Sequence, residues 1–236
     1  MIKAIIFDFG QTLVDSSDGF RSAESEAQKA IFKNLAITDY DHFKKTYRKI
    51  RSEFHQDGNL SRINIWRALF EEFSQEASND NLLKWETSYW KIVERKTTVF
   101  PEVIDTLKYL SSHYEHLALV TNTQGQTSSQ AHRFENHPDL ATFFSIIVVA
   151  GQNDIPAKPN TLAFEMCLKQ LGITSDEAVY IGDDWQNDII ASKEAGLFPI
   201  WLKHHSVKRN YPEVKENITT ITELTELIPL LEALDR

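Results

Sequence analysis

Short apolar runs of strand length recur along the chain, at residues 4–8, 116–121, 144–150, 178–182 and 198–202. Between the later runs, apolar residues take helical spacing. One helix face carries Val103, Ile104, Leu107 and Leu110, and another carries Phe164, Cys167, Leu168 and Leu171. Pro101 near the start of the first pattern and Gly172 after the second are typical helix boundaries. Strands that alternate with helices predict an α/β fold whose parallel sheet is covered by helices on both faces.

The stretch from about residue 19 to 96 has a different pattern, with no convincing strand. It divides into four helix-like segments, at about 20–35, 40–55, 62–75 and 80–95. The third segment is the clearest, because Trp66, Leu69, Phe70 and Phe73 recur at helical spacing. We therefore expect two domains. An all-helical domain at 16–96 is inserted into a core formed by 1–15 and 97–236.

Composition and charge limit the possible partners and location. The chain has 236 residues, 42% hydrophobic and 25% charged, which is ordinary for a globular protein. Its formal net charge of -9 disfavours nucleic acid and anionic lipid as partners. The apolar runs are too short to cross a membrane, and an acid at position 8 interrupts the first run, so no secretory pattern is present. We expect a cytoplasmic protein without a membrane partner. The sequence does not indicate an oligomeric state.

Polar residues follow several of the apolar runs directly. They are Asp8, Thr121 with Asn122, and Asp183 with Asp184, and Lys158 comes a few residues after the third run. In an open parallel sheet, ligands bind at the carboxyl ends of the strands. We therefore expect these side chains to meet at one edge of the sheet.

Each of these signals is weak when taken alone. Asp8 is the usual kind of turn or cap residue, Thr121 and Asn122 are favoured helix caps, and Lys158 before Pro159 is the usual kind of solvated charge. The segment 182–188, Gly-Asp-Asp-Trp-Gln-Asn-Asp, contains three acids, which favour a helix start but are also suitable ligands for a hard cation. Their order along the chain is more specific than any one of them.

The ordered set resembles the haloacid dehalogenase superfamily. The shared pattern is an Asp after the first strand, a Thr after the second, a Lys-Pro pair that opens a helix, and then Gly-Asp-Asp-x-x-Asn-Asp. The resemblance spans essentially the whole chain. It implies a Rossmann-like core, and the helical insert is similar to the first type of cap in that superfamily, a helical bundle over the active site.

The resemblance implies a magnesium-dependent hydrolase and favours a phosphatase acting on a small phosphorylated metabolite. Asp8 would be the nucleophile that forms an aspartyl-phosphate, and Thr121 would donate a hydrogen bond to the phosphoryl group. Lys158 would be the cation that steadies Asp8 and the transferring group. Asn122, Thr12 and Gln11 are the expected substrate-binding residues. The expected metal ligands and their supports are Asp8, the Gly10 carbonyl, Asp183, Asp184 and Asp188. The order of importance of Asp184 and Asp188 is left open.

The first motif departs from the superfamily's phosphatase pattern, Asp-x-Asp-Gly-Thr. This chain has Asp8-Phe9-Gly10-Gln11-Thr12, so Gly10 replaces the second Asp and Gln11 replaces the Gly. In those phosphatases the second Asp protonates the leaving oxygen and then deprotonates the attacking water. Loss of a positioned acid–base group typically costs about 10²–10⁴-fold in rate.

Four interpretations follow from this departure. The first is a phosphatase with a substitute acid or base, such as Asp15, Asp18 or a residue of the helical insert, or with a good leaving group. The second is a dehalogenase-like enzyme, whose halide leaves without a proton, although dehalogenases need no metal and the acids at 183, 184 and 188 are present. The third is a phosphonatase-like enzyme with a Schiff-base lysine in the insert. The fourth is a non-enzyme that binds a phosphorylated ligand. The metal-type acids favour the first.

Overall fold

The computed structural model describes residues 1–126 and 132–235. Within them the chain divides into two compact units. The core unit comprises 1–15, 98–123 and the chain from 132 onward, and the helical unit comprises 16–97 with 124–126. No helix in the described residues is both long and apolar enough to span a membrane.

The core unit contains a six-stranded sheet in the order β5-β4-β1-β6-β7-β8, and every neighbouring pair in it is parallel. The strands are β1 (Ala4–Phe7), β4 (His116–Asn122), β5 (Ile146–Ala150), β6 (Ala178–Gly182), β7 (Phe198–Leu202) and β8 (Thr220–Ile221). In the register, Phe7 at the end of β1 lies opposite Leu119 of β4 and Ile181 of β6. The residues that follow these three strands therefore start from adjacent points on one edge.

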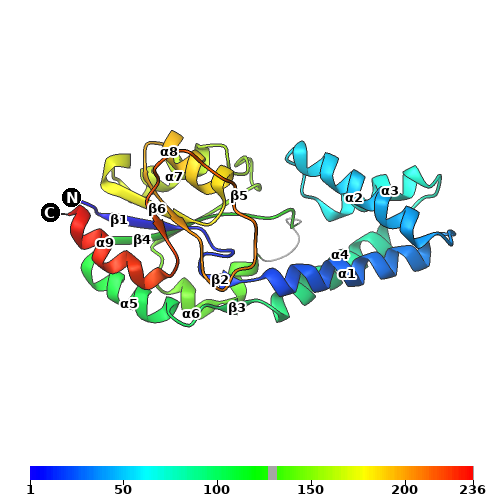
Figure 1. Cartoon of the computed structure of the whole chain (residues 1–236), viewed down its shortest axis with the longest axis horizontal. Helices are drawn as coiled ribbons and strands as arrows, with labels where there is room; N and C mark the ends of the chain where they lie inside the picture. Colours follow the sequence, from blue (N-terminus) through cyan, green and yellow to red (C-terminus); the bar gives the residue numbers. More distant parts are fainter. Residues whose placement is uncertain (127–131, 236) are drawn as a thin grey trace. The chain divides into compact units, whose positions relative to one another are not determined.

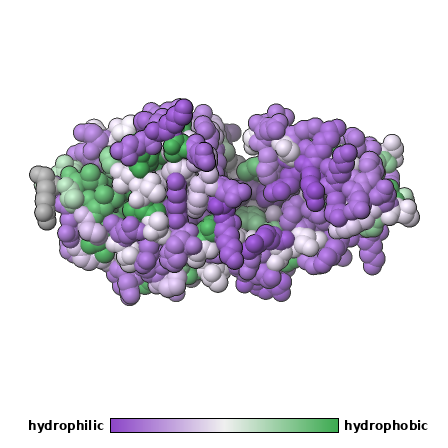
Figure 2. All heavy atoms as spheres, in the orientation of Figure 1, coloured by the Kyte–Doolittle hydropathy of each residue, from purple (hydrophilic) through white to green (hydrophobic). Residues whose placement is uncertain are grey.

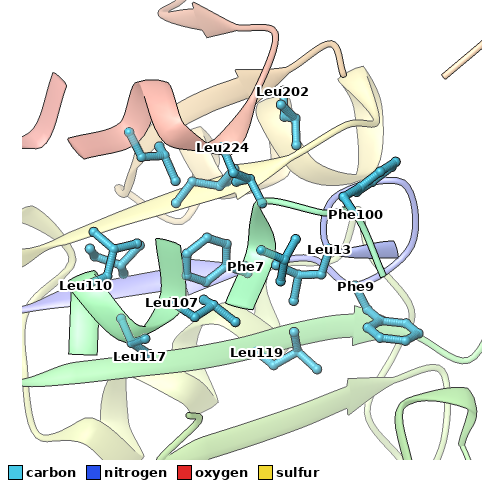
Figure 3. Packing of buried hydrophobic residues seen from close by; sticks show 14 of the residues in the cluster. Phe7, Phe9, Leu13, Phe100, Leu107, Leu110, Leu117, Leu119, Leu202 and Leu224 are labelled. Carbon is cyan, nitrogen blue, oxygen red and sulfur yellow. The ribbon is translucent and has the colours of Figure 1, made fainter. Parts of the chain in front are cut away.

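Alternate residues of the strands face opposite sides of the sheet, and each side is covered by helices (Figure 1). Ile5 and Phe7 pack with α5 (Val103–His113) and α9 (Leu227–Leu234), and Figure 3 shows Phe7 among leucines of α5 and β4. Ala4 and Ile6 pack on the other side with α7 (Leu162–Leu171) and α8 (Ala191–Glu194). This arrangement confirms the predicted α/β class, with helices on both faces.

Shorter elements complete the core unit. They are η1 (Arg133–Asn136), α6 (Pro138–Ala141), η2 (Ser175–Glu177), the π-helix η3 (Trp185–Ile190) and η4 (Leu224–Glu226). A second, two-stranded sheet pairs β2 (Val14–Asp15) antiparallel with β3 (Thr98–Val99). This pair holds side by side the two segments through which the chain leaves the core and returns to it.

The helical unit contains α1 (Ser17–Asn34), α2 (Tyr40–Gln56), α3 (Arg62–Glu72) and α4 (Asn79–Arg95). They lie where the sequence predicts helices and enclose an apolar cluster of their own, which includes Trp66 and Tyr89. Asp39, Ser61 and Ser78 accept backbone N–H bonds at the starts of α2, α3 and α4. Figure 2 shows a mostly hydrophilic face over these helices.

Candidate active site

Asp8 lies at the carboxyl end of the central strand β1 and is 8% exposed. Its backbone N–H donates to the carbonyl of Ile181 on β6 at 2.8 Å, which extends the sheet pairing by one residue. Thr121 lies near the end of β4, and Asp183 directly follows β6, and both are buried. The strand ends thus bring these residues to one edge of the sheet, as expected for a parallel α/β fold.

Three buried carboxylates form a cluster at this edge. Asp8, Asp183 and Asp188 each offer an oxygen, and these oxygens all lie within 4.8 Å of one another. Asp188 reaches the cluster by packing against Gly182, where a Cβ atom would lie 2.4 Å from the Asp188 Cγ. Carboxylate oxygens are the ligands that magnesium prefers. The donor set of these three residues therefore fits a magnesium ion.

Lys158 is buried against the same carboxylates. Its Nζ lies 2.8 Å from Asp8 Oδ1 and 2.6 Å from Asp188 Oδ1. Burial acts to lower the pKa of Lys158, but the Asp188 and Asp8 carboxylates outweigh burial, so the pKa is raised above its ordinary value. The lysine is therefore a charged ammonium that neutralises part of the cluster.

Tyr180 on β6 completes the surroundings of Lys158, and the sequence analysis did not identify it. Its hydroxyl lies 2.8 Å from the Lys158 Nζ, 3.1 Å from Asp188 Oδ1 and 2.9 Å from the Val120 carbonyl. The phenol is fully buried and so needs polar partners. The sequence signal that could have identified Tyr180 is a hydroxyl-bearing residue in the middle of an apolar strand that is buried on both faces.

The acids of the cluster have perturbed pKa values. Burial, followed by the charge of Asp188, raises the pKa of Asp183 well above its ordinary range. Burial raises the pKa of Asp188 to about 6, although Lys158 acts in the opposite direction. Buried carboxylates this close to one another favour either a proton or a cation between them.

Asn122, predicted to bind substrate, has its amide engaged with the backbone of Lys158. The Asn122 Oδ1 accepts from the Lys158 N–H at 2.8 Å, and its Nδ2 donates to the Lys158 carbonyl at 3.1 Å. Both polar ends of the side chain are thus occupied. This arrangement favours a role in positioning Lys158 over direct contact with substrate.

Asp184 and Asp188, which the sequence left unranked, have different surroundings. The Asp184 Oδ1 accepts from the N–H groups of Gln186 and Asn187 and so caps η3. The Asp188 Oδ2 accepts from the Asp184 N–H at 2.9 Å while its Oδ1 faces Lys158. Asp188 lies inside the carboxylate cluster, and Asp184 stabilises the turn that places Asp188 there.

Arg209 is a second residue that the sequence analysis did not identify. Its guanidinium pairs with Asp183 Oδ2 through Nη1 and lies 3.2 Å from Asp184 Oδ2 through Nη2. It belongs to the irregular segment after β7, which has no hydrophobic periodicity, so no sequence pattern places it at the site.

The sequence matches the family model described as haloacid dehalogenase-like hydrolase over residues 5–202. The chain belongs to this family. The match covers more than half of the chain and includes Asp8, Thr121, Lys158 and Asp183, so the resemblance inferred from the ordered motifs is confirmed.

Curated relatives cover nearly the full length of this hydrolase. A glyceraldehyde 3-phosphate phosphatase of Methanocaldococcus jannaschii is 24% identical over 242 residues, which cover 100% of both chains. A phosphoglycolate phosphatase of Chromobacterium violaceum is 29% identical, with 96% of each chain covered.

Solved structures share the fold. A 2-haloacid dehalogenase from Pseudomonas syringae has a TM-score of 0.70 at 21% identity, and the match covers 99% of this chain and 100% of that one. The HAD-hydrolase YfnB of Bacillus subtilis, bound to magnesium, has a TM-score of 0.66 at 25% identity, with 98% of each chain covered.

The altered first motif of this family member forms a tight turn after Asp8. Gln11 has φ of 59°, a left-handed conformation that glycine adopts most easily, and its N–H donates to the Val14 carbonyl at 2.7 Å. Thr12 is fully buried, and its hydroxyl has no hydrogen-bond partner in the residues described. Burial favours a structural role for Thr12 over the predicted contact with substrate. Gly10 forms an isolated bridge with Val14.

The two nearby acids weighed as replacements for the missing catalytic Asp lie in different elements. Asp15 is the second residue of β2, opposite Thr98 of β3. Asp18 is in the first turn of α1, is exposed, and pairs with Arg21 three residues later.

Proposed function

We propose that this chain is a magnesium-dependent phosphatase that hydrolyses a small phosphorylated metabolite through an aspartyl-phosphate on Asp8. The observation that carries the proposal is the buried cluster of Asp8, Asp183 and Asp188 with Lys158 against it. A cluster of acids with a single lysine retains net negative charge, which a divalent cation would offset. The relatives named as phosphatases support this choice.

The residues proposed to hold magnesium are Asp8, Asp183 and Asp188, with the backbone carbonyl of Gly10. Asp184 supports them by capping η3. When bound, magnesium reduces the repulsion between the Asp8 carboxylate and a phosphate dianion and stabilises charge in the transition state. The solved structure of YfnB of Bacillus subtilis is bound to magnesium, which supports the choice of this ion.

The nucleophile in this proposal is held in place by the protein. The sheet fixes the Asp8 backbone through Ile181, and the Lys158 ammonium fixes its Oδ1. The amide of Asn122 in turn fixes the backbone of Lys158 from both sides. A carboxylate that is already oriented loses little freedom when it attacks phosphorus. Thr121, at the end of the neighbouring strand, would donate its hydroxyl to a phosphoryl oxygen.

Gly10 sets the limit of this chemistry, because it provides no side chain to protonate a leaving alcohol. We expect turnover to depend on the leaving group, with a phenolate favoured over an alkoxide. The cost of the missing acid–base group is about 10²–10⁴-fold for a poor leaving group.

The proposed substrate class is a small phosphate monoester. Phosphoglycolate and glyceraldehyde 3-phosphate, the substrates named for the relatives, define the first compounds to test. We further propose that the helical unit acts as the cap of this enzyme and selects the substrate, since no pattern in the core distinguishes one leaving group from another.

A second candidate activity, dehalogenation, is favoured by one observation only, the glycine at position 10. A halide leaves without a proton, so Gly10 would be no handicap. The carboxylate cluster opposes this candidate, because a metal has no function in that reaction. Metal-independent release of chloride from a 2-chloroacid would support it over the phosphatase proposal.

Hydrolysis of p-nitrophenyl phosphate tests the proposal. We expect activity with magnesium, none with a chelator, and none in Asp8→Asn, which preserves the shape of the side chain. Substantial turnover in Asp8→Asn would refute the covalent step. Tight binding of magnesium and phosphate without turnover of any of these esters would identify a binding protein instead. Trapping of phosphonoacetaldehyde by borohydride would identify a phosphonatase.

A further inference from the structure

The irregular segment after β7 places a cation on Asp183, one of the carboxylates proposed to hold the metal, and on its neighbour Asp184. The Arg209 guanidinium pairs with Asp183 through Nη1 and with Asp184 through Nη2. The side chain of Arg209 is 34% exposed, whereas that of Asp183 is 6% exposed. Arg209 thus reaches from the surface to Asp183, a buried member of the cluster, whereas the Lys158 ammonium pairs with Asp8 and Asp188.

The segment that carries Arg209 packs against the core unit on both sides of this residue. Val207 is buried in the hydrophobic core. On the other side, Tyr211 lies edge-on against Trp201 with ring centroids 5.7 Å apart, and the Arg209 guanidinium lies 5.4 Å from the Tyr211 ring. Trp201 also donates its Nε1–H to the Asp183 carbonyl at 3.0 Å. The packing of Val207 and Tyr211 therefore keeps Arg209 beside Asp183 in the ion-free protein.

We propose that Arg209 is an internal competitor of the metal ion: it occupies Asp183 and Asp184 in the ion-free protein and is displaced when magnesium binds. The inference rests on the magnesium site of the proposed function. Its physical basis is that a guanidinium and a divalent cation placed on the same carboxylate repel each other. Binding of one therefore weakens binding of the other.

Two features of the segment support a second position for Arg209, away from Asp183 and Asp184. The Tyr211 hydroxyl is buried and has no hydrogen-bond partner in the part of the chain that the structure describes. A buried donor without a partner costs free energy, so the arrangement with Arg209 on the acids leaves this group unsatisfied. Arg209 also retains an exposed portion of its side chain, which leaves it a path into solvent.

The competition has two consequences. In the ion-free protein Arg209 stabilises Asp183, whose burial would otherwise leave a carboxylate without a cation. In the loaded protein the displacement of Arg209 is a cost of binding, so Arg209 sets the magnesium concentration at which the site fills. Arg209 is in this sense a residue that determines metal affinity, acting through Asp183 and Asp184.

The test compares Arg209→Gln with Lys208→Gln in the full chain. Lys208 is the neighbouring exposed residue, so its variant removes the same unit charge from the same segment. The affinity for magnesium alone is measured by titration calorimetry. We expect Arg209→Gln to bind magnesium about tenfold more tightly than Lys208→Gln, which corresponds to ~1.4 kcal/mol. Thermal unfolding provides a second readout. Arg209→Gln should unfold at a lower temperature than Lys208→Gln with a chelator, and this difference should vanish at saturating magnesium.

The outcomes separate this inference from the proposed function. Equal affinities in the two variants, or weaker binding in Arg209→Gln, would overturn the competition while leaving the magnesium site in place. Absence of magnesium binding in the wild type and both variants would refute the site itself, and the competition with it. If a variant does not fold, a crystal structure of the wild type with magnesium decides the matter. An Arg209 guanidinium withdrawn from Asp183 is expected, and one that stays paired with Asp183 beside the bound ion would contradict displacement.

Discussion

Replacement of Lys158 by Met provides a sensitive test of the proposed charge balance at the site. Met keeps much of the apolar stem but removes the ammonium that contacts Asp8 at 2.8 Å and Asp188 at 2.6 Å. The side chains of Lys158 and Asp188 are each only 2% exposed, so water cannot replace the lost cation easily. Removing one partner of a buried ion pair costs about 3–5 kcal/mol, and we expect a loss of stability in that range.

Lys193→Met is the matched control. Lys193 pairs with Glu216 at 2.7 Å, a similar distance, but the two side chains are 52% and 50% exposed. An exposed pair contributes below about 1 kcal/mol, so this variant should unfold almost as the wild type does. The free energies of unfolding are measured with urea in the presence of a chelator.

Magnesium should reverse part of the loss in Lys158→Met, because the ion binds carboxylates that have lost their other cation. An ion that binds only the folded state stabilises it by about 2.7 kcal/mol at a concentration 100 times its Kd. The increase in stability on adding magnesium should therefore be larger in Lys158→Met than in wild type. A variant destabilised no more than Lys193→Met, or one that magnesium does not rescue, would refute the account of this cluster.

Three further predictions concern neighbouring positions. Gly182→Ala should weaken magnesium binding at least tenfold by calorimetry, because its Cβ would lie 2.4 Å from the Asp188 Cγ, and unchanged affinity would show that Asp188 does not need this position. Burial lowers the pKa of His132 from 6.5 to about 4. The folded state holds this imidazole neutral, so its contribution to the unfolding free energy is complete above pH ~6.5 and is lost as the pH falls toward 4. Between pH 7 and 5 the unfolding free energy of wild type should fall by about 2 kcal/mol more than that of His132→Asn, with His113→Asn as an exposed control that matches wild type. Gly10→Asp should raise turnover of an alkyl phosphate by about 10²-fold or more and that of p-nitrophenyl phosphate much less, and a decrease for both esters would mean that Gly10 serves another chemistry.

The regular elements were predictable because their patterns extend over many residues. The four helices of the insert repeat apolar residues at helical spacing. Five strands of the main sheet are continuous apolar runs, namely β1, β4, β5, β6 and β7. The two-residue strands β2, β3 and β8 were not predicted. A strand of two residues is too short to show periodicity, and its pairing depends on which other segment lies beside it.

The site was predictable to the extent that it follows from strand ends. Asp8, Thr121 and Asp183 are placed by the sheet itself, and the family pattern adds Lys158. The contacts of Asn122 and Tyr180 could not be derived in this way, because they depend on how the Lys158 loop folds back onto β4 and β6. Arg209 depends on the path of an irregular segment, for which the sequence contains no periodic signal.

An acid quench during turnover tests the covalent step at Asp8. Wild-type protein mixed with magnesium and p-nitrophenyl phosphate is quenched within a single turnover, digested and analysed by mass spectrometry. We expect a phosphoryl group on the peptide that contains Asp8, and none in Asp8→Asn. Release of phosphate with no modified peptide at any quench time, or with the phosphoryl group on another residue, would contradict it.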